Sequence, residues 1–192
     1  FRRQGDRAPR RGAARPGSDR RLCGAVAGPG WESATVEACV RRKYRGAHLG
    51  AQSLDDRILA LNQRGHTLAQ TRQATALLRR FGFKLVLHWM PNLLGATLES
   101  DRQDFPRLWD GLCPDEIKIY PTQLLANADL YQNWQRGEYQ PYSTQELVSL
   151  IADIKPTIPR YCRVNRVIRD IPSTNVVAGN KRTSLRQDVQ QE

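Results

Sequence analysis

The stretch Phe83-Lys84-Leu85-Val86-Leu87-His88-Trp89 decides the fold class, because it is apolar at nearly every position. A strand that is apolar on both of its faces has to be covered on both, which is typical of strands inside a parallel sheet. Pro91 and Gly95 follow in the chain and mark a loop. We therefore predict that residues 83–89 form an inner strand of a parallel α/β sheet.

Three further segments predict strands of the same sheet, and they cover residues 47–50, 116–120 and 161–168. The centres of the four strands lie near positions 49, 87, 119 and 164, so they are separated by 38, 32 and 45 residues. Each interval leaves room for a helix, and this spacing fits strand–helix units that close into part of a β/α barrel. The sequence therefore predicts an α/β fold that is a partial β/α barrel.

Polar residues at helix starts predict the helices between these strands. Ser53 is the expected cap of a helix that runs to about Asn62, and Thr67 is the expected cap of the next helix. Gly82 is expected to end that second helix, since glycine tolerates a positive φ there. Further helices are expected near residues 100–109, 129–136 and 144–155.

Residues 1–46 differ in composition from the rest of the chain. They carry 12 Lys and Arg against 4 Asp and Glu, whereas residues 47–192 carry 18 against 15. Arg, Gly, Ala and Pro fill 28 of the 46 positions, and no hydrophobic period is sustained. Such a segment cannot bury enough apolar surface to offset its ordering entropy. We expect a disordered basic leader, either a solvated tail that holds polyanions non-specifically or a dedicated nucleic-acid arm.

The sequence also excludes several kinds of segment and site. No run of about 18 apolar residues exists, so no membrane span is expected. The cysteines Cys23, Cys39, Cys113 and Cys162 are 16, 74 and 49 residues apart, and no CxxC spacing occurs. A zinc or iron–sulfur site cannot be built locally from this spacing, and we expect no metal ligands. The patterns GxSxG, HExxH and the P-loop are absent as well.

Candidate functional residues lie where the predicted strands end, because the active sites of β/α barrels lie at the carboxyl ends of the strands. The segments in question are Gln52-Ser53, residues 88–90, residues 120–122 and residues 166–170. A structural interpretation stands beside the functional one. In that interpretation Ser53 is a helix cap, His88 a hydrogen-bonded core imidazole and Pro121 a strand end.

The last predicted strand carries an arginine at every third position, namely Arg163, Arg166 and Arg169. On a strand this period places successive arginines on alternating faces, so at least one should point inward, where it has to be paired. Asp170 is the adjacent candidate partner, and an inward arginine near a strand end is equally suited to an anion or phosphate. Lys181 and Arg182 add positive charge just beyond the strand.

Six motifs that span most of residues 50–186 resemble one known family. They are GAQSLDD at 50–56, NQRGHT at 62–67, GFKLVLHWMPNLLG at 82–95, DEIKIYPT at 115–122, LYQNWQRGEYQPY at 130–142 and RVNRVIRDIPSTNVVAGNKRTSLR at 163–186. In this order they resemble the radical S-adenosylmethionine (SAM) domain of the Elongator catalytic subunit family, in its bacterial or archaeal form. The resemblance implies that residues 47–125 are the later strands of a radical SAM barrel and residues 126–192 its C-terminal extension.

The resemblance implies an enzyme that modifies C5 of the wobble uridine of tRNA, a tRNA carboxymethyluridine synthase. In this family a three-cysteine motif holds a 4Fe-4S cluster that cleaves SAM, and an acetyltransferase-like domain binds acetyl-CoA as co-substrate. The implied partners are therefore tRNA and acetyl-CoA, and the implied location is the cytoplasm.

The family pattern also implies roles for individual residues. Gln52, Arg64 and His88 are the expected SAM contacts. An amide can hydrogen-bond to the ribose, and a guanidinium can pair with the methionine carboxylate through two bonds. Lys118 and Tyr120 are expected to face the same cavity. The expected RNA contacts, through phosphates, are Arg166, Arg169, Lys181 and Arg182.

Two parts of the family pattern have no counterpart in this sequence, the cluster-binding cysteine motif and the acetyltransferase domain. Leu94 stands where the family usually has a proline, and the chain begins with Phe1 instead of Met. We therefore expect a fragment that is inactive alone, with the missing half of the same enzyme as a candidate partner. The alternatives are a non-catalytic RNA-binding remnant and a gene-model artefact with an out-of-frame leader.

Overall fold

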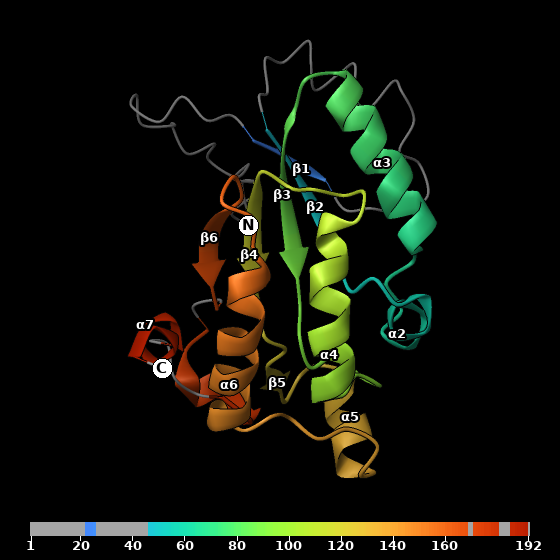
Figure 1. The fold of residues 1–192 in the computed structure, drawn as a ribbon. Helices are drawn as coiled ribbons and strands as arrows, with labels where there is room; N and C mark the ends of the chain where they lie inside the picture. Colours follow the sequence, from blue (N-terminus) through green and yellow to red (C-terminus); the bar gives the residue numbers. More distant parts are fainter. Residues whose placement is uncertain (1–21, 26–45, 169–170, 181–184, 192) are drawn as a thin grey trace, which may run out of the picture.

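The structure, a computed structural model, describes residues 22–25, 46–168, 171–180 and 185–191 (Figure 1). Its centre is a five-stranded sheet in the order β1-β2-β3-β4-β6, and all neighbouring strands run parallel. The strands are β1 (Leu22–Ala25), β2 (Gly46–Gln52), β3 (Lys84–Trp89), β4 (Glu116–Ile119) and β6 (Arg163–Val167). The predicted α/β fold and its four predicted strands are confirmed.

The strand β1 departs from the sequence prediction. It lies within residues 1–46, where the composition predicts no strand, yet it pairs in parallel with residues 46–49 of β2. A strand partner satisfies backbone donors and acceptors whatever the local composition, so this pairing leaves no local signal. The other residues before position 46 lie outside the described residues, and so does the leader prediction made for them.

Helices fill the intervals between the strands, as predicted, and a further helix after residue 184 was not predicted. After β2 come α2 (Asp56–Leu61) and α3 (Leu68–Arg80), and after β3 come α4 (Leu98–Asp104) and the 3-10 helix Phe105–Trp109. After β4 come α5 (Leu130–Gln135), α6 (Thr144–Ile154) and the 3-10 helix Lys155–Thr157. The helix α7 (Leu185–Gln191) follows β6 in the chain. A second sheet was not predicted, and it pairs β5 (Leu124–Leu125) with β7 (Val176–Ala178) in antiparallel fashion.

Side-chain caps explain where the first two helices begin. Thr67 caps α3 as predicted, because its hydroxyl accepts from the Gln70 amide while the Gln70 side chain accepts from the Thr67 amide. Gly82 follows this helix with a φ of 75°, also as predicted. The prediction that Ser53 caps α2 is wrong, since the carboxylate of Asp55 accepts hydrogen bonds from the Arg57 and Ile58 amides instead.

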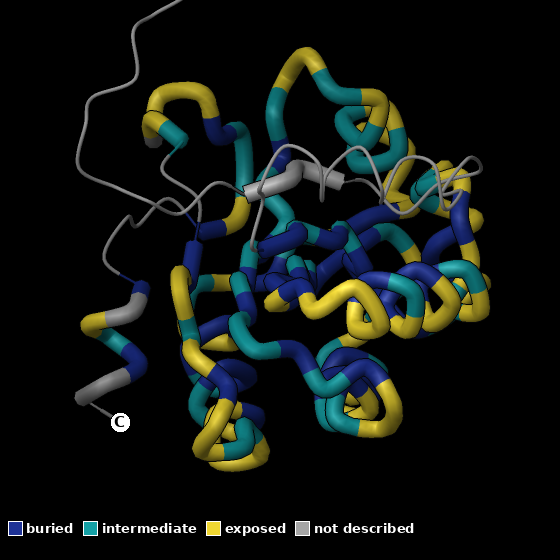
Figure 2. The backbone as a smooth tube through the Cα atoms, turned by 90° about the horizontal axis from the view of Figure 1, so that it is seen from above, coloured by how far each residue is buried: buried dark blue, intermediate teal, exposed yellow. Residues whose placement is uncertain are grey.

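The central sheet has two unlike faces, because side chains alternate along each strand. In Figure 1, α4 and α6 lie in front of the sheet and cover one face. The strand side chains that are at most 1% exposed in this core are Ala47, Leu49, Ala51, Leu85, Leu87, Trp89, Ile117 and Ile119. Figure 2 shows the buried backbone concentrated in the sheet and on the inner sides of the helices. Among the described residues, no helix is both long and apolar enough to cross a membrane.

Candidate functional site

The sheet face opposite α4 and α6 carries polar side chains on adjacent strands. His88 of β3 lies beside Lys118 of β4 in the strand register, and Lys118 lies beside Arg166 of β6. His48 of β2 joins them through its ring. His48, His88 and Lys118 are half-buried and Arg166 is exposed. We call these four residues the polar row.

The first three members of the polar row are in direct contact. Nδ1 of His48 lies 3.0 Å from Nε2 of His88, and Nζ of Lys118 lies 3.4 Å from the same His48 nitrogen. The ring of Tyr120, just after β4, meets the ring of His88 edge to face, with centroids 5.5 Å apart. The two histidines, the lysine and the tyrosine therefore form one cluster above three neighbouring strands.

Burial and positive charge keep the two imidazoles neutral. Burial, then the Lys118 ammonium and then His48, lowers the pKa of His88 to about 4. Burial and Lys118 also lower the pKa of His48, against an opposing effect of Glu116. The pKa of Lys118 is lowered as well, by burial and by Arg166. At neutral pH the cluster thus offers two uncharged rings beside an amine whose charge is less favourable than in water.

Gln52 ends β2 with its amide lying over this face. Its φ is 65°, a left-handed conformation that β2 adopts where its register with β3 shifts. A Cβ placed on Gly50 would lie 2.8 Å from Nε2 of Gln52, so the missing side chain of Gly50 makes room for the amide. Oε1 of Gln52 is buried and has no hydrogen-bond partner among the described residues. A buried acceptor without a donor is rare and marks a place where a ligand can bond.

Arg64 reaches the same end of β2 through the turn between α2 and α3. His66 anchors this turn, because Nδ1 lies 3.0 Å from the carbonyl oxygen of Arg64 and Nε2 lies 3.4 Å from that of Ala51. Ala51 is the neighbour of Gln52 in β2. Nε of Arg64 is buried without a hydrogen-bond partner among the described residues, and burial lowers the pKa of the guanidinium. Two orphaned polar atoms thus belong to residues at one strand end.

Two buried aspartates of α4 hold the strand ends from the covered side, and neither was predicted. Asp104 accepts hydrogen bonds from the Leu54 amide at 3.0 Å, from Nε1 of Trp89 at 3.1 Å and from the Ser53 hydroxyl at 3.3 Å. Burial raises the pKa of Asp104 even though these donors favour the carboxylate. Asp104 therefore fixes the segment that follows Gln52, so it supports the site without facing it.

Asp101 holds the loop after β3 in a similar way. Its Oδ2 accepts from the Asn92 amide at 2.8 Å and from the Tyr142 hydroxyl at 3.0 Å. The Tyr139 hydroxyl donates to the Asn92 carbonyl at 3.0 Å. Burial raises the pKa of Asp101 to about 7. Asn92, with a φ of 64°, is thereby clamped on both its amide and its carbonyl.

The structure brings together most of the sequence-predicted candidates. Gln52, His88 and Lys118 share the open face, Tyr120 contacts His88, and the turn of Arg64 adjoins the end of β2. Their roles stay predictions. His48 was missed, although the alternation of residues 48, 50 and 52 along β2 places it on the face of Gln52.

The expectation of an inward, paired arginine on the last strand stays a prediction, because Arg169 is not among the described residues. Arg163 and Arg166 are both exposed, because β6 is an edge of the five-stranded sheet. Arg169, Asp170, Lys181 and Arg182 lie outside the described residues. Both described arginines are thus accessible to an external anion.

No group of three or more His, Cys, Asp or Glu side chains in the described part of the chain could hold a metal ion. Cys113 is half-buried and Cys162 is buried, and burial raises the pKa of the Cys162 thiol to about 11. A thiol with so high a pKa is a poor source of the thiolate that metals bind, and neither cysteine belongs to a group of three potential metal ligands among the described residues. These two cysteines do not fit a cluster site.

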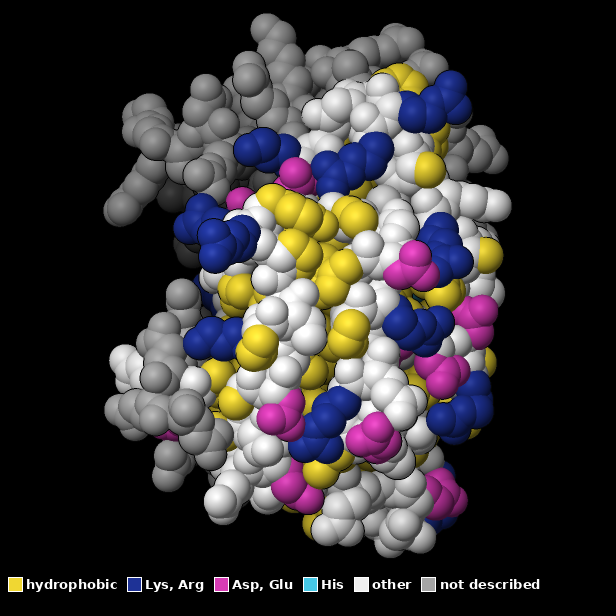
Figure 3. Space-filling view, viewed as in Figure 1, with side chains coloured by type: hydrophobic (Ala, Val, Ile, Leu, Met, Phe, Trp, Pro, Cys, Tyr) yellow, Lys and Arg dark blue, Asp and Glu magenta, His cyan; other side chains and the backbone are white. Residues whose placement is uncertain are grey.

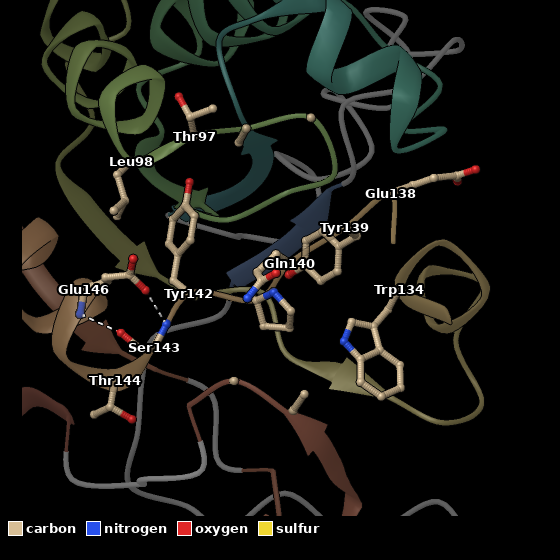
Figure 4. A pocket seen from close by; sticks show the side chains of 15 residues that line it. Thr97, Leu98, Trp134, Glu138, Tyr139, Gln140, Tyr142, Ser143, Thr144 and Glu146 are labelled. Atoms are coloured by element: carbon tan, nitrogen blue, oxygen red, sulfur yellow. Dashed lines mark hydrogen bonds between the residues drawn. The ribbon is translucent and has the colours of Figure 1, made fainter. Parts of the chain in front are cut away.

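A separate cavity of about 890 Å³ opens on the covered side, between the start of α4 and the segment before α6 (Figure 4). Trp134, Tyr139 and Tyr142 contribute aromatic rings to its wall. Figure 4 shows Ser143 and Glu146 bonded to each other as the cap of α6, so their polar groups are already used. None of the predicted site residues lines this cavity. In Figure 3 basic and acidic side chains are interspersed over the same side, without one dominant sign.

Comparisons with known proteins agree with this geometry. Residues 114–192 match the family model of the radical SAM C-terminal domain. A tRNA uridine(34) acetyltransferase of Dehalococcoides mccartyi is 43% identical over 145 residues, which are 74% of this chain and 31% of that protein. The human Elongator complex protein 3 is 36% identical over 141 residues, which are 72% of this chain and 26% of that protein.

Solved structures show the same relationship. An archaeal Elp3 of Methanocaldococcus infernus superposes with a TM-score of 0.84 at 32% identity. The superposition covers 88% of this chain and 40% of the archaeal chain. The coproporphyrinogen III oxidase HemN of Escherichia coli, a radical SAM enzyme, superposes with a TM-score of 0.56 at 17% identity, which shows the fold alone.

The parallel sheet with its polar open face is thus the α/β fold of radical SAM proteins. Within that class, the chain belongs to the Elongator catalytic subunit family, whose curated members include tRNA uridine(34) acetyltransferases. It spans about a third or less of the length of these curated relatives.

Proposed function

We propose that this chain supplies part of the SAM site of an enzyme that modifies C5 of the wobble uridine of tRNA, with acetyl-CoA as co-substrate. The proposal rests on family membership for the reaction and on one structural observation for the site. That observation is the pair of orphaned buried atoms, Oε1 of Gln52 and Nε of Arg64, at the end of one strand that faces the polar row.

These residues fit the parts of SAM by their chemistry. The Gln52 amide offers both a donor and an acceptor to a ribose, and the Arg64 guanidinium can pair with the amino-acid carboxylate through two bonds. The neutral rings of His48 and His88 do not repel a sulfonium cation, as two imidazolium rings would. When bound and reduced, SAM supplies the radical that abstracts a hydrogen atom in this class of reaction.

Lys118 and Tyr120 complete the proposed cavity wall. Lys118 is a hydrogen-bond donor beside His48, and the Tyr120 ring packs on the edge of His88. The described residues do not fit a 4Fe-4S cluster, so we derive no step through one. Activity therefore depends on cluster ligands other than the described residues, and we propose that the described part alone binds but does not cleave SAM.

Equilibrium dialysis of this chain against radiolabelled SAM tests the proposal. Gln52→Leu and Arg64→Met should each weaken binding by about tenfold, because each removes a hydrogen bond to the ligand or its charged partner. Arg72→Met is the matched control, since Arg72 lies on α3 with half of its side chain exposed. Equal affinity of all four proteins would contradict the assignment of the site.

A second candidate function, RNA binding without catalysis, is favoured by the exposure of Arg163 and Arg166 on the edge strand. Phosphate contacts make binding salt-dependent. If this function holds, a chain lacking residues 1–21, which keeps β1, should still bind tRNA, and the double change Arg163→Gln and Arg166→Gln should flatten the salt dependence. Arg163→Gln alone, which changes no member of the polar row, should leave SAM binding unaltered. Binding that vanishes with residues 1–21 would assign it to the basic leader.

A further inference from the structure

The contacts of His48 fix which of its nitrogens carries the hydrogen. Nδ1 of His48 faces Nζ of Lys118 at 3.4 Å and Nε2 of His88 at 3.0 Å. A lysine ammonium has hydrogens to donate and no lone pair to offer. An N–H on Nδ1 would point its hydrogen toward that ammonium, so Nδ1 presents its lone pair. Because a neutral imidazole has one N–H, this places the hydrogen of His48 on Nε2, which is buried and has no hydrogen-bond partner among the described residues.

The state of His88 follows from that of His48. With a lone pair on Nδ1 of His48, the 3.0 Å contact is a hydrogen bond only if Nε2 of His88 carries the hydrogen and donates it. Nδ1 of His88 is then an acceptor. Nδ1 of His88 makes no hydrogen bond to the described residues, and it is not among their buried polar atoms that lack a partner. No donor among the described residues occupies this lone pair.

The surrounding charges support this assignment. Lys118 and Arg166 face the pair from β4 and β6, and Glu116 of β4 is the opposing acid. The pKa values of both histidines are lowered, that of His88 to about 4, so a neutral tautomer is the form present at pH 7. The tautomer is then set by hydrogen bonding, as is usual for paired histidines.

We propose that His48 is a positioning residue: oriented by Lys118, it holds His88 in the tautomer whose Nδ1 accepts a hydrogen bond from a sugar hydroxyl. The tautomer follows from the contacts of this chain alone. The identity of the ligand group rests on the proposed function, because a ribose is the hydroxyl-bearing part of SAM. A ligand that presents an acceptor at this point, such as a phosphate oxygen, finds no donor there.

Nitrogen spectra of the uniformly 15N-labelled chain test the tautomers directly at pH 7. The sequence contains three histidines, so three ring patterns are expected. His48 and His88 should both carry the hydrogen on Nε2. His66 should carry it on Nδ1, because that nitrogen lies 3.0 Å from the Arg64 carbonyl oxygen whereas Nε2 lies farther, 3.4 Å, from the Ala51 carbonyl oxygen, so it is an internal reference of the opposite kind. A hydrogen on Nδ1 of His48, or on Nδ1 of His88, would overturn the proposal.

Two variants separate positioning from mere packing. His48→Leu should release His88 into a mixture of tautomers, while the His66 pattern stays unchanged and reports that the fold is intact. Lys118→Met should mix the tautomers of both His48 and His88, whereas Lys118→Arg, which keeps a donor and a charge, should preserve them. A His88 ring that keeps its hydrogen on Nε2 in His48→Leu would show that His48 does not hold it.

Adenosine, 2′-deoxyadenosine and 3′-deoxyadenosine are the probes for the hydroxyl. Adenosine should shift the Nδ1 resonance of His88, and one of the two deoxy compounds should bind about tenfold more weakly, the loss expected for one hydrogen bond. His48→Leu should reduce this discrimination. Equal binding of all three probes would overturn the sugar-hydroxyl part of the proposal. Absence of adenosine binding would overturn that part together with the proposed SAM site, while the tautomer is judged by the spectra of the free chain.

Discussion

Neighbouring residues of β2 and β3 lie in opposite surroundings, and the contrast separates stability from binding. Leu49 and Leu87 are fully buried against the helices, whereas His48 and His88, one position away, face the polar row and contact each other. Burying a leucine contributes about 2 kcal/mol to folding. The contact of two neutral histidines beside a lysine contributes little to the free energy of folding by comparison. The helix-covered face therefore carries most of the apolar packing, although Val86 on the other face is buried as well, and the polar row is free to be arranged for a ligand.

The largest expected effect is on the covered face. Trp89→Ala removes a fully buried ring that packs on Phe105 with centroids 4.8 Å apart, and it should lower the free energy of unfolding by about 4 kcal/mol. His88→Ala on the open face of the same strand should change it by less than about 1 kcal/mol. Urea unfolding followed by circular dichroism measures both. Similar losses in the two variants would contradict the contrast between the faces.

The pH dependence of stability should reveal Asp101. Its folded pKa of about 7 lies above the ordinary value of 3.8, so the folded state keeps a proton that the unfolded state loses. The contribution of this group is therefore present at about pH 4 and is lost as the pH rises to 7. The loss should amount to about 3 kcal/mol, since each unit of pKa difference is worth about 1.4 kcal/mol.

Denaturant midpoints of the intact chain and of Asp101→Asn, measured at several pH values, isolate this term because the other groups titrate alike in both. The difference between the two proteins should change steadily between about pH 4 and 7. A difference that stays constant would mean that Asp101 titrates in its usual range.

Asp104 provides a third, smaller effect with a functional consequence. Asp104→Ala leaves the Leu54 amide and Nε1 of Trp89 buried without an acceptor, which should cost about 2 kcal/mol. Asp104→Asn retains one oxygen acceptor and should cost less. Because Asp104 fixes the segment after Gln52, the alanine variant should also bind SAM more weakly than its loss of stability explains. Dialysis at a temperature where both variants are folded checks this.

Gly50→Ala should have the smallest effect on stability and a clear one on binding. The added Cβ would lie 2.8 Å from Nε2 of Gln52, the movable end of a side chain, so unfolding should change by less than about 0.5 kcal/mol. The amide, however, has to leave its position over residue 50. SAM affinity should therefore fall although the melting temperature does not. A drop in melting temperature with unaltered affinity would place Gln52 outside the site.

How much of this was predictable depends on how local the cause is. Residues 83–89 and the strand spacing predict the parallel sheet, because a run of consecutive apolar residues indicates a strand that is buried on both faces. The Thr67 cap is equally local. By contrast, β1 is held by pairing with β2 inside an Arg- and Gly-rich stretch, and β5 pairs with β7 more than 40 residues away along the chain, so neither has a signal of its own.

The site divides in the same way. Gln52, Arg64 and His88 stand in motifs that the sequence displays, and the structure places them around one strand end. The role of His48 depends on its contact with a ring 40 residues away along the chain, and that of Asp104 on hydrogen-bond donors about 50 residues away. Contacts of this range depend on the strand order. They become visible once the sheet is assembled.

The clamp on Asn92 has a practical consequence for anyone who divides this chain. The Tyr139 and Tyr142 hydroxyls that reach Asn92 and Asp101 come from 47 and 41 residues downstream, beyond the boundary suggested near position 126. A piece that ended at that boundary would expose the Asn92 carbonyl and the Asp101 carboxylate to water at the base of the strand ends. We therefore expect the two halves to unfold together, and to refold best when they are produced as one polypeptide.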